Sequence, residues 1–170
     1  MNEDTKPLIV RKGEGTRYRQ GPAIFMASGF ETGGRFDFFE MNVEYLTGPG
    51  LHWHATQDDT FYVLEGTLTV QCRDDVIDIG PGDFISIPPG TPHTFDNINP
   101  NQPPVRVLNM MTPGGYDGLF AENEVLTADA SEAEQDAINA KYEVTYVGPP
   151  LAETLGRSPR RPEWGEHALG

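Results

Sequence analysis

The feature that most constrains this chain is a pair of histidines placed two residues apart. His52 and His54 flank Trp53. Side chains two apart on a β-strand point to the same face, so both imidazoles are expected to point into one interior and Trp53 away from it. A third imidazole and a carboxylate from neighbouring strands would complete a set of three nitrogens and one oxygen. Such a set suits Fe, Mn, Ni, Co, Cu or Zn.

A second block of sequence offers the third imidazole. It runs from Gly82 through Pro88 and Gly90 to His93 and Asn97. Proline stops the hydrogen-bond ladder of a strand, and glycine permits the bend that would present His93. A lone histidine is most simply an ordinary buried residue with hydrogen-bond partners. Three histidines in these two blocks, with an acidic residue nearby, instead favour a metal site.

Together the two blocks resemble the two motifs of the cupin family. The first motif is His-x-His, three or four residues, Glu, six residues and Gly. Here four residues separate His54 from Asp59, and six residues separate Asp59 from Gly66. The second motif is Gly, five residues, Pro-x-Gly, two residues, His, three residues and Asn. Its fixed positions are matched by Gly82, Pro88, Gly90, His93 and Asn97.

The resemblance implies an all-β fold, a double-stranded β-helix of the jelly-roll type, with one divalent transition metal ion per chain. The metal ligands would be His52, His54, His93 and, in place of the family's Glu, Asp59. Asp58 is a rival carboxylate, but the distance to Gly66 favours Asp59. Aspartate is one methylene shorter than glutamate, so three roles stay open for it: a direct ligand, a partner of a metal-bound water, or a general base.

Further segments resemble the single-domain cupins similar to quercetin 2,3-dioxygenase. They are residues 61–66, residues 112–116 with Leu119 and Phe120, and Tyr142 with residues 147–151. In that family three His and one Glu hold the metal, and the Glu also acts as a base toward the flavonol hydroxyl. The resemblance implies a metal-dependent dioxygenase for a small aromatic or enolic, flavonol-like substrate, with Asp59 as the catalytic residue and dioxygen as the second substrate.

Two other functions stay open. One is a non-oxidative tailoring enzyme (a cyclase, isomerase or decarboxylase) that uses the metal as a Lewis acid. The other is a non-enzymatic cupin that binds a small ligand in its barrel. A regulator is disfavoured, since sensors usually carry an output domain.

Composition limits the partners and the location. The formal net charge of -14 disfavours nucleic acid and anionic membranes, which both require positive patches. No signal peptide or transmembrane run is recognised, so a cytoplasmic location is expected. The apolar run of Leu8, Ile9 and Val10 could form an arm strand, and with the outward Trp53 it predicts a homodimer.

Four segments are expected along the chain: an N-terminal arm at 1–22, the cupin barrel at 23–112, a C-terminal extension at 113–150 and a loose tail at 151–170. The extension contains one predicted helix at 131–142, with Ser131 and Glu134 in a capping-box pattern. A strand is expected at 35–45. Its apolar residues change phase near Phe38 and Phe39, which predicts a β-bulge there or two apolar faces.

The remaining candidates are side chains rather than motifs. Cys72, the single cysteine, is expected to be a small core residue, His167 a solvated surface imidazole, and Asn97 a partner of loop backbone. Aromatic residues on strands are more often plain core, so at most half of the candidate cavity walls are expected to touch a ligand. These candidates are Phe36, Phe38, Phe39, Met41, Phe61, Phe95, Leu108 and Met110.

Overall fold

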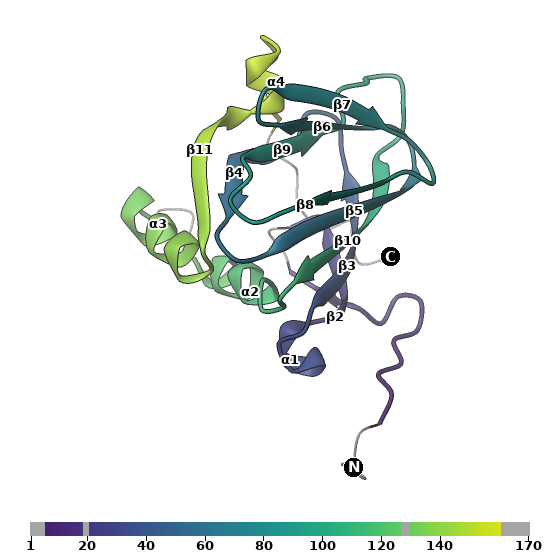
Figure 1. Ribbon diagram of the computed structural model, residues 1–170, viewed down its shortest axis with the longest axis vertical. Helices are drawn as coiled ribbons and strands as arrows, with labels where there is room; N and C mark the ends of the chain where they lie inside the picture. The colour runs from purple at the N-terminus through teal and green to yellow at the C-terminus, as the bar shows by residue number, and fades with distance from the viewer. Residues whose placement is uncertain (1–5, 19–20, 127–129, 161–170) are drawn as a thin grey trace.

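The computed structural model describes residues 6–18, 21–126 and 130–160, which form two antiparallel sheets around one core (Figure 1). The first sheet contains, in spatial order, β1 (Thr16–Arg17), β2 (Ala23–Ala27), β3 (Asp37–Val43), β10 (Val105–Thr112), β5 (Asp58–Glu65) and β8 (Phe84–Ile87). The second contains β11 (Val144–Pro150), β4 (Gly50–His54), β9 (His93–Asp96), β6 (Leu68–Cys72) and β7 (Asp75–Ile79). Strands distant in sequence are neighbours in both sheets, as in a jelly roll, so the predicted fold is confirmed.

Clean alternation along the central strands builds the core. In β3 and β10 every second side chain is buried, the pattern of an antiparallel sheet with one face on a core. Of the two alternatives expected near Phe38, β3 shows the second: its alternation is unbroken with apolar residues on both faces, and the register shift lies in the partner strand β2, between Phe25 and Ala27. Phe39 therefore packs inward, while Phe38 is only partly buried.

Four helices lie outside the sheets in the described residues: α1 (Gly29–Thr32), α2 (Asp117–Val125), α3 (Glu132–Lys141) and α4 (Leu151–Thr154). Helix α3 is the predicted helix, and Ser131 and Glu134 form its capping box. Helix α2 was not expected. It contacts α3, which in turn contacts β11 (Figure 1). Glycine at position 118 of α2 leaves room for Tyr142 at the end of α3, because a Cβ there would lie 2.6 Å from the Tyr142 ring.

The two ends of the described chain differ from expectation. Residues Leu8, Ile9 and Val10 form no strand, and the first strand is instead β1. The expected loose tail does not begin at residue 151. Leu151 and Ala152 are buried, and the backbone N–H of Arg160 donates to the carbonyl of Leu46. Residues 161–170, with His167, lie outside the described residues.

No helix in the described ranges is both long enough and apolar enough to cross a membrane.

The burial of Leu151 predicts that α4 stabilises the fold. Leu151→Ala should lower the free energy of unfolding by about 2–5 kcal/mol, the usual cost of removing a fully buried leucine side chain. Leu155→Ala is the matched control, because Leu155 is 43% exposed and should change stability by less than about 1 kcal/mol. Chemical denaturation measures both, and equal small effects would show that the segment from 151 is loosely held after all.

Candidate metal centre

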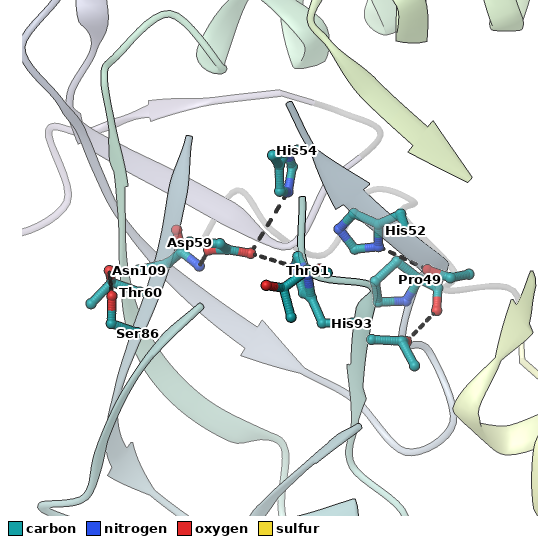
Figure 2. Close-up of polar contacts among 11 residues, drawn as sticks. Pro49, His52, His54, Asp59, Thr60, Ser86, Thr91, His93 and Asn109 are labelled. Atoms are coloured by element: carbon teal, nitrogen blue, oxygen red, sulfur yellow. Dashed lines mark hydrogen bonds and ion pairs between the residues drawn. The ribbon is translucent and has the colours of Figure 1, made fainter. Parts of the chain in front are cut away.

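Three histidines and one aspartate from both sheets meet inside the fold. β4 carries His52 and His54, β9 carries His93, and β5 of the opposite sheet carries Asp59. All four side chains are buried, and one potential ligand atom from each lies within 4.8 Å of all the others. Figure 2 shows Asp59 pointing toward His54 and His93, with His52 on the far side of the group. The four residues named from the sequence therefore converge on one point.

Backbone carbonyls fix the orientation of two imidazoles. The Nδ1–H of His52 donates to the carbonyl of Gly50, and that of His93 to the carbonyl of Thr91, each at 2.8 Å. With Nδ1 protonated, the Nε2 lone pair of a neutral imidazole is free for a metal ion, which is the usual arrangement around histidine ligands. Within the described part of the chain, Nδ1 of His54 has no hydrogen-bond partner.

The two oxygens of Asp59 have different neighbours. Oδ2 lies 3.1 Å from Nε2 of His93 and 3.8 Å from Nε2 of His54. Oδ1 accepts a hydrogen bond of 2.7 Å from Nδ2 of Asn109, which comes from β10. One carboxylate oxygen thus faces the imidazoles, and the other is held by an amide.

The contact between His93 and Asp59 tests whether these residues suit a metal ion. Both ring nitrogens of His93 face oxygen acceptors, but a neutral imidazole carries only one N–H. A cation is therefore required between Nε2 and Oδ2, either a second proton or a metal ion. The donor set of three imidazole nitrogens and one carboxylate oxygen suits a divalent first-row metal. The residues present fit such an ion.

Burial and mutual proximity shift the pKa values of this group in opposite directions. Burial, with the neighbouring imidazoles, lowers the pKa of His52 to about 3. Burial also lowers the pKa of His54 to about 4, although Asp59 opposes the shift. For His93 burial acts the same way, but the hydrogen bond and charge of Asp59 outweigh it and raise its pKa. Burial would raise the pKa of Asp59, yet its contacts with His93, His54 and Asn109 lower it.

Next to the cluster lies a cavity of about 280 Å³. Its walls are mostly apolar and aromatic, with His52 and Asp59 among them. Of the eight wall candidates expected from the sequence, three line it: Phe39, Met41 and Phe95. The other lining residues are Pro22, Val43, Thr47, Pro49, Asn109, Met111, Tyr116, Leu119, Phe120, Asn123 and Tyr146. No lysine or arginine is among the described residues that line it.

Strand parity explains the wall residues that were chosen wrongly on β10. Leu108 and Met110 are partly or largely exposed, whereas Asn109 and Met111 are buried and reach the cavity. The sequence does indicate which face is outward: Arg106 and Thr112 are polar, and they lie on the same face of the strand as Leu108 and Met110. No comparable alternation indicates which residues of α2 and β11 face the cavity.

Three smaller expectations agree with the structure. Trp53 is only partly buried while its neighbours His52 and His54 are buried. Asn97 is buried, and its Nδ2 donates to the backbone carbonyls of Val43 and Pro103, both at 3.4 Å. Cys72 packs against the core, where burial raises the pKa of its thiol.

Comparisons with known proteins agree with this architecture. A cupin domain model matches residues 39–111. Quercetin 2,3-dioxygenase of Bacillus subtilis is 25% identical over 116 residues, which are 67% of this chain and 34% of that enzyme. An uncharacterized protein of Methanocaldococcus jannaschii, MJ1618, is 30% identical over 61% of this chain and 76% of its own length.

Among solved structures, an uncharacterized Klebsiella pneumoniae protein with a double-stranded β-helix domain aligns with a TM-score of 0.51 and 18% identity. The match covers 65% of this chain and 93% of that one. This chain belongs to the cupin superfamily and resembles quercetin 2,3-dioxygenase. It spans about a third of the length of that enzyme.

The cluster predicts one divalent metal ion per chain. The double variant His54→Ala, His93→Ala should lose the ion while keeping its β-rich circular dichroism, because the backbone ladders that pair β4 and β9 with their neighbours do not use these side chains. His167→Ala is the matched control and should keep the metal. Elemental analysis of purified protein gives the stoichiometry, and full metal retention in the double variant would contradict the assignment.

The shifted pKa values predict how protons compete with the metal. At about pH 5.5, His52 and His54 are already neutral, whereas His93, with its raised pKa, is protonated. Metal binding should then release about one proton, and affinity should fall as the pH falls. Calorimetry in buffers of different ionisation enthalpy counts the protons. Release of nearly three would mean that the imidazoles titrate like free histidines.

Proposed function

We propose that this cupin is a metal-dependent dioxygenase whose substrate is a small, neutral aromatic or enolic molecule. The observation that supports this most strongly is the buried cluster of three histidines and Asp59 beside an apolar, aromatic cavity. The likeness to quercetin 2,3-dioxygenase points to the same chemistry.

The size and charge of the cavity restrict the substrate. Its volume of about 280 Å³ is just below the roughly 300–1,000 Å³ typical of sites for drug-sized ligands. An anionic substrate would find no lysine or arginine among the described lining residues, and the chain as a whole is strongly acidic. A compact phenol or enol that enters in its neutral form suits these walls. A carboxylate substrate, as a decarboxylase would need, suits them less.

Asp59 is the residue placed to accept a proton. Its Oδ2 faces the cluster, and its low pKa keeps the carboxylate ionised at neutral pH. When bound, a divalent metal ion would supply the positive charge that favours the deprotonated substrate and the redox chemistry through which dioxygen reacts. The hydroxyl proton of the substrate would pass to Oδ2 of Asp59 and return to the product, which in a dioxygenase reaction contains both atoms of dioxygen.

Two aromatic side chains lie where the substrate would bind beside the cluster. Tyr116 packs edge-on against His54, with 5.1 Å between the ring centroids, and the ring centroids of Tyr146 and His52 are 5.4 Å apart. Burial raises the pKa of Tyr116 well above its ordinary value, so its hydroxyl remains a hydrogen-bond donor at neutral pH. A planar substrate between these rings would lie beside the cluster, where orientation alone contributes to the rate.

Oxygen consumption distinguishes the dioxygenase from the other two functions. Metal-loaded protein should consume oxygen with at least one member of a panel of flavonols, catechols and cyclic enols. Both atoms of labelled dioxygen should appear in the product by mass spectrometry. Turnover without oxygen loss would indicate a non-oxidative enzyme, and tight binding without turnover a ligand-binding cupin.

A homodimer and a cytoplasmic location remain part of the proposal. The exposed Leu8 and Ile9 offer apolar surface for a partner copy. Light scattering that finds only monomers at micromolar concentration would refute the dimer.

The role of Asp59 predicts a specific loss of rate. Asp59→Asn keeps the shape of the side chain and leaves three imidazoles for the metal. It should lower the turnover of metal-saturated protein by about two to four orders of magnitude, because the proton acceptor is gone. Asp58→Asn is the matched control, since Asp58 is the adjacent, partly exposed carboxylate and should have little effect.

Asp59→Glu restores the residue that the quercetinase-like family uses. A gain of flavonol cleavage would mean that the shorter carboxylate directs the site toward another substrate. If Asp59→Asn weakens metal binding but spares turnover at saturating metal, Asp59 is a ligand rather than the base. Unchanged activity and metal content in both variants would refute any role for Asp59.

A further inference from the structure

Among the described residues outside the cluster, Asn109 is the one whose side chain donates a hydrogen bond to Asp59. It lies on the inner face of β10, where it pairs with Phe61, while Asp59 pairs with Met111 on the same two strands. The two polar side chains are therefore diagonal neighbours across the sheet, and Nδ2 of Asn109 donates to Oδ1 of Asp59 at 2.7 Å. Both side chains are buried.

The surroundings of Asn109 argue against a purely structural role. Its own Oδ1 is buried and accepts no hydrogen bond from the described residues. An unpaired buried acceptor is destabilising, and the other inward residues of β10, such as Val107 and Met111, are apolar. Packing alone would favour an apolar side chain at this position. The contact with Asp59 is the feature that only an amide supplies here.

The hydrogen bond from Asn109 gives the two oxygens of the Asp59 carboxylate different partners. A free carboxylate binds a metal ion through one oxygen or through both. In this fold Oδ1 is engaged by Asn109, and only Oδ2 faces His54 and His93. An aspartate held in this way occupies a single position around an ion, so a further position is left for a substrate oxygen.

We propose that Asn109 is a positioning residue that restricts Asp59 to one oxygen toward the metal and thereby keeps a coordination position open for substrate. The inference rests on the proposed metal site with Asp59 as a ligand through Oδ2, and not on the dioxygenase reaction. It assigns a role in substrate binding to a residue that lies outside both histidine motifs.

Cobalt(II) is the probe, because its visible absorption weakens as its coordination number rises. In Asn109→Leu the freed Oδ1 should join the coordination of the ion, and the band intensity should fall by at least about twofold. Catechol, titrated without oxygen, should bind about tenfold more weakly, because the position it needs is filled. Asn109→Ala removes the same donor with a smaller side chain and serves if the leucine variant does not fold.

Two control variants separate this role from a general effect on the cavity. Asn109→Gln keeps an amide donor and should restore the wild-type cobalt spectrum. Asn123→Leu removes a different cavity amide, whose Oδ1 accepts from Gln135 at 2.9 Å, and should leave the spectrum unchanged.

The failures of the two proposals are distinguishable. An unchanged spectrum and unchanged catechol affinity in cobalt-loaded Asn109→Leu would overturn the role of Asn109 alone. A folded variant that no longer binds cobalt would also overturn it, since Asn109 would then only hold the site together. Wild-type protein that binds no cobalt would overturn the metal site and this inference together. Absence of oxygen uptake would overturn the dioxygenase and leave these spectra unaffected.

Discussion

The contact between His93 and Asp59 joins the two sheets, and it lies where the side chains buried between them are polar. β9 and β5 belong to opposite sheets, and their inner faces otherwise meet through side chains such as Phe61 and Phe95, 4.9 Å apart. Burying a carboxylate among imidazoles is tolerable only if its charge is compensated. A proton on His93 does this in the metal-free protein, and a divalent ion would do it more completely. The other two histidines, the cavity and Asn109 all lie around this pair.

Much of the candidate centre could be predicted because strand geometry is simple. A spacing of two residues placed His52 and His54 on one face, and the bend after Pro88 presented His93 to the same interior. The choice of Asp59 over Asp58 agrees with the burial of Asp59 and the partial exposure of its neighbour. Alternating strands with frequent turns predicted an antiparallel β architecture, and the resemblance to cupins implied the jelly roll.

Other features of the site and fold could not be predicted from the sequence, because they depend on contacts between distant segments. The parity of β10 places Asn109 inward, but its hydrogen bond to Asp59 joins residues 50 positions apart and could not be predicted from the sequence. Tyr116 and Phe120 line the cavity from the start of α2, which packs against α3 and, at Gly118, against the ring of Tyr142. The burial of Leu151 likewise comes from the packing of α4 on β9 and β11. No local sequence pattern predicts this packing.

The central claim is that one metal ion binds where the two sheets meet, held by His52, His54 and His93 with Asp59 beside it. Anomalous diffraction at the absorption edge of the metal found by elemental analysis tests this most directly. The account predicts one strong peak per chain, about 2.0–2.2 Å from the Nε2 atoms of the three histidines and close to Oδ2 of Asp59. Metal-replete crystals with no peak at this position, or with the peak elsewhere on the protein, would contradict it.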